Sequence, residues 1–102
     1  KREVMIIKEI FEQLVTSEHP VAKALHSGEH FRVLAIGFKA GMKLKEHQAH
    51  MPSKLTVLKG EVIYSEGEKK VKLGQYDEVN IPVNTLHSVE ALQDSLCLLT
   101  QG

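Results

Sequence analysis

Three histidines in the chain have the residue type and spacing of a metal site. His47 and His50 lie three residues apart in "KEHQAHMP", and His87 follows later in "IPVNTLH". Neutral imidazole is a ligand for Zn, Fe, Ni, Cu or Mn, and catalytic metal sites commonly use three protein ligands and leave a position open. The histidines therefore predict a site for one divalent transition metal (Zn, Fe, Ni or Mn). The alternative is a metal-free barrel with histidines in its pocket.

The elements around these histidines decide whether they can meet. On one regular strand His47 and His50 would point to opposite faces. Pro52 favours a break, so we expect His47 to end a strand, residues 48–52 to form a loop and Ser53 to begin the next strand. Spacing alone does not bring His87 to this site, but in a small two-sheet barrel it would lie on an adjacent strand facing the same cavity. Three further histidines precede these segments, and we expect them at the surface or in turns: His19, His26 and His30.

The first part of the chain predicts one helix. In residues 5–15, "MIIKEIFEQLV", the apolar side chains recur in the pairs expected of one buried stripe: Ile6, Ile7, Ile10, Phe11, Leu14 and Val15. His19-Pro20 ends this segment, because the residue before a proline avoids the helical region. A short strand over "VAKAL" is a weaker expectation.

From residue 30 onward the sequence has the texture of short strands. Segments such as "FRVLAIGF", "KLTVL", "EVIY" and "SLCLLT" are rich in β-branched and apolar residues, and glycines and prolines separate them. Gly67 in "SEGE" predicts a tight hairpin turn, and Lys59-Gly60 predicts a tight connection between "LTVL" and "EVIY". This pattern predicts an antiparallel sandwich or barrel. We expect a single domain over residues 1–102, with a helix and lead-in strand in 1–29 and the β-barrel in 30–100.

The order and spacing of five residues resemble the two motifs of the cupin superfamily. The first motif is Gly-x5-His-x-His-x3/4-Glu-x6-Gly, and the second is Gly-x5-Pro-x-Gly-x2-His-x3-Asn. Gly41, His47 and Gly60 match the first motif, and Pro82 and His87 match the second. The resemblance spans about residues 31–99. It implies an all-β fold, a cupin-type double-stranded β-helix (jelly-roll barrel) with a short N-terminal helix.

The sequence departs from these motifs at five positions. Ala49 and Ser53 occupy the positions of the second histidine and the glutamate, so two of the usual four metal ligands remain, and His50 is a candidate replacement. Tyr76 occupies the opening glycine of the second motif, Asn84 its second glycine and Ala91 its final asparagine. Asparagine tolerates the left-handed conformation better than other side chains, so Asn84 is a mild change.

The resemblance leaves two functional classes open. The first is a barrel that binds a small molecule in its mouth, with or without a metal held by His47, His50 and His87, and with Ser53 and Tyr64 in the ligand pocket. The second is a metal-dependent enzyme of the dioxygenase or isomerase type, for which no catalytic residue can be named. A role in interaction alone, with an empty pocket, is a third. Small cupins commonly dimerise, so we expect a homodimer.

Composition bears on which partners the protein binds and on the compartment in which it works. Thirteen basic and thirteen acidic residues cancel without forming a basic stripe, which does not favour a nucleic-acid partner. The apolar runs are too short for a membrane span, and acidic residues interrupt the N-terminal stretch, unlike a secretory signal. The lone cysteine, Cys97, favours a reducing, cytoplasmic setting and a packing role in the core.

Overall fold

The computed structural model of the protein describes residues 4–102, which form one helix followed by nine strands. The elements in chain order are α1 (Ile6–Leu14), β1 (Val21–Ser27), β2 (Arg32–Phe38), β3 (Lys43–His47), β4 (Ser53–Lys59), β5 (Val62–Glu66), β6 (Lys69–Leu73), β7 (Glu78–Ile81), β8 (His87–Ala91) and β9 (Ser95–Gln101). The expected all-β class with a short N-terminal helix is therefore confirmed.

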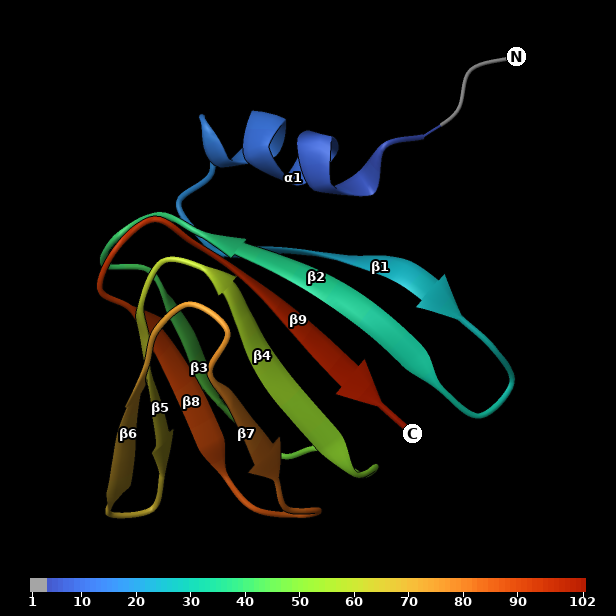
Figure 1. Ribbon diagram of the computed structural model, residues 1–102, viewed down its shortest axis with the longest axis vertical. Coiled ribbons are helices and arrows are strands. Elements are labelled where there is room, and N and C mark those ends of the chain that lie inside the picture. The colour runs from blue at the N-terminus through green and yellow to red at the C-terminus, as the bar shows by residue number, and fades with distance from the viewer. Residues whose placement is uncertain (1–3) are drawn as a thin grey trace.

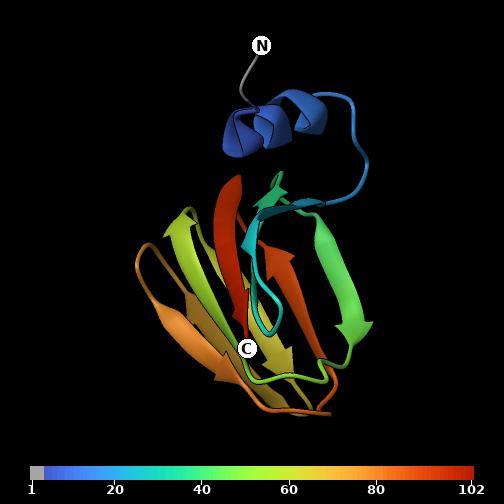
Figure 2. The same cartoon turned by 90° about the vertical axis from the view of Figure 1, so that its right-hand side faces the viewer.

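The strands form two antiparallel sheets that face each other as a flattened barrel (Figures 1 and 2). The five-stranded sheet has the order β1-β2-β9-β4-β7, and the four-stranded sheet has the order β3-β8-β5-β6. Sequence neighbours such as β3 and β4 lie in different sheets, so the chain repeatedly crosses from one layer to the other. The strand over "VAKAL" is β1, which pairs with β2 at the edge of the larger sheet.

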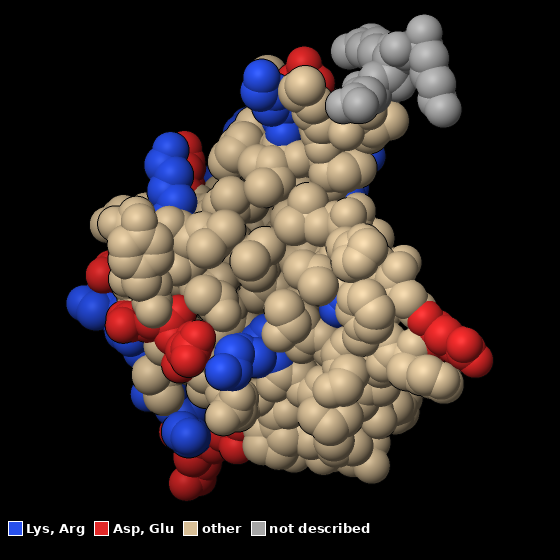
Figure 3. Space-filling view, turned by 45° about the vertical axis from the view of Figure 1, so that its right-hand side comes forward, with Lys and Arg blue, Asp and Glu red and all other residues tan. Residues whose placement is uncertain are grey.

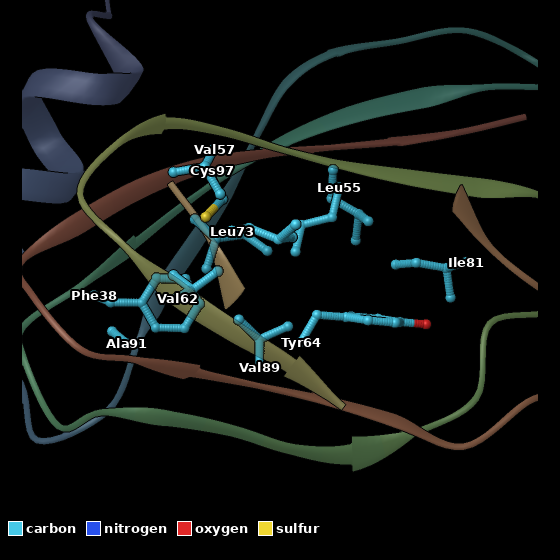
Figure 4. Packing of buried hydrophobic residues seen from close by; sticks show 12 residues of the cluster. Phe38, Leu55, Val57, Val62, Tyr64, Leu73, Ile81, Val89, Ala91 and Cys97 are labelled. Atoms are coloured by element: carbon cyan, nitrogen blue, oxygen red, sulfur yellow. The ribbon is translucent and has the colours of Figure 1, made fainter. Parts of the chain in front are cut away.

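The core fills the space between the two sheets, because every second residue of each strand points inward. Figure 4 shows side chains from both layers meeting there. The buried cluster comprises Ile36, Phe38, Leu55, Val57, Val62, Tyr64, Leu73, Ile81, Val89, Ala91, Cys97 and Leu99. Cys97 is fully buried within it, and burial raises the pKa of its thiol to about 12. The expected packing role of this cysteine is confirmed.

Helix α1 lies across the outer face of the five-stranded sheet (Figure 1). Ile10 and Leu14 are buried there and pack against the alanine and glycine side of β2. A Cβ atom at Gly37 would come within 2.5 Å of Ile10 Cγ2, so this close approach requires glycine. The prediction that Phe11 and Val15 share the buried stripe is wrong: they are 41% and 71% exposed. The sheet covers only the side of α1 that carries Ile10 and Leu14, with Ile6 and Ile7 partly buried beside them.

The turns include the two positions, Tyr76 and Asn84, at which this sequence replaces a glycine of the second motif. Gly67 has φ of 59° between the paired strands β5 and β6, which confirms the predicted hairpin turn. Gly60 has φ of 92° and forms the predicted tight connection, which leads from β4 in one sheet to β5 in the other. Asn84 has φ of 60°, the left-handed conformation expected at this position. Tyr76 has φ of 71° in the Gly74–Asp77 turn, which is closed by a hydrogen bond from Asp77 N–H to the Gly74 carbonyl. This third turn position normally favours glycine.

Two further expectations concern the surface. His19, His26 and His30 are exposed, as predicted. Across residues 4–102, no helix combines the length and the apolar character that crossing a membrane requires.

Candidate functional site

The site is built where strands of both sheets end at the same rim of the barrel, which we call the mouth. In the five-stranded sheet the residues paired across this rim form one row, the upper row: Ser27, Arg32, Gln101, Ser53 and Ile81. Arg32 is in phase with Leu34 and Ile36 on β2, so it belongs to the inward-facing series. The apolar interior therefore gives way to polar side chains at this level.

The four-stranded sheet contributes a second row at the mouth, the lower row: His47, His87, Glu66 and Lys69. His47 ends β3 and His87 begins β8, as predicted, and the two residues pair directly across the sheet. Side chains paired across antiparallel strands lie on the same face, which brings two residues forty positions apart in the sequence into contact.

The two imidazoles pack closely and share one tautomer. Their ring centroids lie 4.1 Å apart with the planes tilted by 57°. His47 Nδ1–H donates to the Lys45 carbonyl over 2.9 Å, and His87 Nδ1–H donates to the Thr85 carbonyl over 3.1 Å. Because a carbonyl can only accept, each Nδ1 carries the proton and each neutral ring keeps a lone pair on Nε2. Backbone acceptors of this kind fix the ring orientation of histidines that bind metals.

Burial keeps His87 neutral. It is 2% exposed, and the loss of water lowers the pKa of its imidazole. The Thr85 carbonyl opposes this shift, while the neighbouring His47 adds to it and Glu66 opposes it. Neutral imidazole is the form that accepts a hydrogen bond or binds a metal.

Tyr64 belongs to the buried core and contacts two residues of the lower row, His87 and Glu66. Its ring is 6.0 Å from the ring of His87, and its hydroxyl donates to Glu66 Oε1 over 2.8 Å. Burial, then the hydrogen bond and the charge of Glu66, raise the pKa of Tyr64 well above its ordinary value. Figure 4 shows the ring among the core side chains with its oxygen at the end nearest Ile81. Tyr64 is thus a neutral hydrogen-bond donor committed to Glu66.

A cavity of about 370 Å³, the inner cavity, opens at the mouth between the two sheets. Its lining is mostly apolar with polar groups at the rim: Ala22, Arg32, Leu34, Ile36, Leu44, His47, Gln48, Ala49, His50, Met51, Leu99 and Gln101. Both sheets and the loop over residues 48–52 contribute to it. This size and this composition are typical of sites for small molecules.

A second cavity of about 380 Å³, the outer cavity, lies beside the first and mainly on the outer face of the five-stranded sheet. Its lining includes Val33, Lys54 and Thr100, which alternate with the inward-facing residues of their strands. We regard the inner cavity as the candidate site because both sheets converge on it and His47 reaches it.

The upper row contains a connected chain of hydrogen bonds. Arg32 Nε–H donates to Gln101 Oε1 over 2.6 Å, and Gln101 Nε2–H donates to Ser53 Oγ over 3.3 Å. Ser53 Oγ–H in turn donates to the Met51 carbonyl over 2.9 Å. Ser53, which stands at the glutamate position of the first motif, is 7% exposed and serves to hold Gln101. It borders the outer cavity.

The third predicted metal ligand, His50, lies on the exposed loop beside the pair. Its Nδ1–H donates to Asn84 Oδ1 over 3.2 Å, so its Nε2 also keeps a lone pair. Among residues 4–102, no group of three or more His, Cys, Asp or Glu side chains is gathered closely enough to hold a metal ion. The donor atoms have the right chemistry, and the structure brings two of the three histidines together. The set of His47, His50 and His87 stays a prediction.

Three residues of the mouth were not foreseen from the sequence. Arg32 and Gln101 line the inner cavity, and Glu66 joins the lower row beside His87. A signal for Arg32 exists: it is the one charged residue in phase with the buried series Leu34, Ile36 and Phe38 in "FRVLAIGF". The positions of Gln101 and Glu66 at the mouth follow only from the register of the paired strands.

Comparison with known proteins shows which fold this chain shares. No protein-family model matches the chain, and no curated protein matches its sequence. Solved structures do match. A cupin superfamily protein from Desulfitobacterium hafniense DCB-2 superposes with a TM-score of 0.78 at 17% identity, over 82% of this chain and 77% of that one. The fold is that of a small cupin domain.

Two further cupin structures extend the likeness. An RmlC-like cupin protein from Desulfovibrio desulfuricans has a TM-score of 0.75 at 27% identity, over 81% of each chain. A cupin-2 domain containing protein from Shewanella frigidimarina NCIMB 400 has a TM-score of 0.74 at 11% identity, over 96% of this chain and 93% of that one. The resemblance drawn from Gly41, His47, Gly60, Pro82 and His87 is thereby confirmed at the level of fold.

The two positions that depart from the first motif, Ala49 and Ser53, have other structural roles in this protein. Ala49 is 6% exposed and lines the inner cavity, while its carbonyl accepts the Asn84 N–H over 2.8 Å. Ser53 holds Gln101 and through it Arg32. A hydroxyl in place of a carboxylate leaves the upper row without a negative charge.

Proposed function

We propose that the protein binds a small molecule in the inner cavity at the mouth of its cupin barrel. The observation that carries this proposal is the cavity itself, about 370 Å³ with an apolar lining and a rim of Arg32, His47 and Gln101. Pockets that bind small molecules combine an apolar lining with a few oriented polar groups. Here the polar groups are fixed by hydrogen bonds: His47 by the Lys45 carbonyl and Arg32 by Gln101.

A cavity-blocking variant with a matched control tests the proposal. Ala22 is exposed on β1 and lines the inner cavity, so Ala22→Trp should fill it without disturbing the core. Ala40 is exposed in the turn after β2 and lines neither cavity, so Ala40→Trp controls for the added indole. A panel of small organic acids, amides and alcohols is screened by thermal stabilisation. Saturable stabilisation of the wild type and Ala40→Trp, lost in Ala22→Trp, is expected. Equal response of both variants, or none in the wild type, would refute the proposal.

A second candidate is that a divalent transition metal binds beside this cavity. The supporting observation is the pair of Nε2 lone pairs on His47 and His87, each ring held by a backbone carbonyl. His50 supplies the third ligand in this proposal. When bound, the metal would supply a Lewis acid, as the dioxygenase or isomerase alternative requires. No general base accompanies it among the lining residues, so small-molecule binding is the function we favour.

Elemental analysis separates the two candidates. Protein purified without chelators or a histidine tag is analysed as wild type, His47→Ala, His50→Ala and His87→Ala. The metal proposal expects stoichiometric metal in the wild type and a loss in each variant. Retention in His50→Ala alone would confine the site to the pair. Absence of metal from the wild type, with folding unchanged in the variants, would end the metal proposal and leave small-molecule binding standing.

We further propose that the protein is a homodimer. Support comes from two large apolar side chains that are exposed, Phe11 on α1 and Val15 at its C-terminal end. Apolar groups gathered on one helix face are typical of surfaces that pack against a partner. The cytoplasmic setting inferred from Cys97 stays a prediction.

A further inference from the structure

Arg32 is a cation at the mouth whose charge has no counterpart nearby. It lines the inner cavity and also borders the outer one, and among residues 4–102 no carboxylate lies within 4 Å of its guanidinium. We propose that the ligand of the inner cavity is a small organic carboxylate with an apolar body, and that Arg32 binds its carboxylate group. This inference rests on the proposed function and names the chemical class of its ligand.

The guanidinium is oriented before any ligand arrives. Its Nε–H is held by Gln101 Oε1 over 2.6 Å, and Gln101 is held in turn by Ser53. Of the five N–H donors of an arginine, this leaves the four on the two Nη atoms. A planar pair of such donors matches the two oxygens of a carboxylate, and pre-orientation reduces the entropy lost on binding.

The apolar residues that line the rest of the inner cavity favour a ligand whose remaining part is apolar. Leu34, Ile36, Leu44 and Leu99 form the apolar part of the inner cavity. Arg32 is the only lysine or arginine among the lining residues of this cavity. One cation beside an apolar cavity of about 370 Å³ fits a monocarboxylate, whose single charge is at one end and whose carbon skeleton lies on the leucines.

The other charges near the mouth leave this site positive. Glu66 lies in the lower row, where it accepts the Tyr64 hydroxyl, and it is not among the lining residues. Lys54 alternates outward on β4, borders the outer cavity and pairs with Glu78 over 3.4 Å. In Figure 3 most charged side chains lie along the left edge and the top, one acidic group lies at the right edge, and much of the lower right is uncharged.

The test uses two probes of nearly the same size and shape, the anionic 3-phenylpropanoate and the neutral 3-phenylpropanamide. Binding to the full chain is measured by calorimetry at fixed ionic strength for the wild type, Arg32→Met, Gln101→Glu and Lys54→Met. Arg32→Met removes the guanidinium and keeps an apolar stem. Gln101→Glu gives Arg32 an internal carboxylate partner. Lys54→Met removes one positive charge outside the inner cavity and controls for net charge.

The proposal expects the wild type and Lys54→Met to bind the carboxylate at least about tenfold more tightly than the amide, as a charge-assisted pair provides. Arg32→Met and Gln101→Glu should lose this preference and keep their affinity for the amide. Equal affinity of the wild type for both probes would overturn the role of Arg32 and leave the proposed function intact. If neither probe binds, the assignment of this ligand class is wrong. The proposed function would still stand if an uncharged compound of the screening panel stabilised the wild type and not Ala22→Trp.

Discussion

His87 is a buried imidazole, and its position makes stability depend on pH. Burial lowers its pKa in the folded protein below the ordinary value of 6.5. Between these two pKa values the unfolded chain binds a proton that the folded chain does not, so stability falls as pH falls below about 6.5. We predict that His87→Gln, which cannot titrate, shows a smaller loss of unfolding free energy between pH 7.5 and 5.0 in urea titrations. Parallel losses in the variant and the wild type would contradict this explanation.

Tyr76 is a second residue whose local conformation has a measurable cost. Its φ of 71° is in the left-handed region, and its side chain is 74% exposed. A non-glycine residue held there costs on the order of 1 kcal/mol, partly offset by the greater freedom of an unfolded glycine. We predict that Tyr76→Gly raises the unfolding free energy by ~0.5–1 kcal/mol. Tyr76→Ala, which keeps the strain, should stay near the wild type, and an equal gain in both variants would assign the effect to the exposed ring.

At the scale of elements, the close contact between α1 and β2 depends on Gly37, which has no side chain. A methyl group at Gly37 would meet Ile10 Cγ2 at 2.5 Å and Leu14 Cδ1 at 2.8 Å. Overpacking of this kind typically costs about 1–3 kcal/mol, so Gly37→Ala should lower the unfolding free energy by that amount. In an Ile10→Ala background the same substitution should cost less, because the nearest atom has been removed. Equal costs in both backgrounds would contradict the view that Ile10 limits the space at this glycine.

The elements were largely predictable from the sequence because local chemistry fixes them. Pro52 separates β3 from β4, and the loop between them begins after His47, as the sequence indicated. The helix was predicted correctly, yet Phe11 and Val15 were placed on its buried face. Periodicity alone cannot show how wide a stripe the supporting sheet covers.

The mouth was less predictable because cross-strand register assembles it. The meeting of His47 and His87 followed from the family motifs and is seen in the structure. The alignment of Arg32 with Gln101 and Ser53 depends on the pairing of β2, β9 and β4, and no local sequence signal specifies that pairing. Long-range register is set by the whole hydrophobic pattern of a sheet rather than by any one segment.

At the scale of the whole molecule, the exposed side of α1 bears on the oligomeric state. We predict that sedimentation equilibrium at micromolar concentration gives twice the chain mass of 11.4 kDa. Phe11→Gln, which removes apolar surface from the outer side of α1, should shift the equilibrium toward the monomer. Phe31→Gln changes an exposed phenylalanine in the β1–β2 turn and should leave it unchanged. A wild-type protein of 11.4 kDa under these conditions would contradict the homodimer.

The central claim is that a small molecule binds between the two sheets at the mouth, and amide NMR with 3-phenylpropanoate tests it most directly. The claim predicts saturable shifts for inner-cavity residues such as Leu34, Ala49 and Leu99. Residues confined to the outer cavity, such as Val33, Asn80 and Thr100, should be less affected. Shifts centred on the outer cavity, or no saturable shifts with any compound of the screening panel, would contradict it.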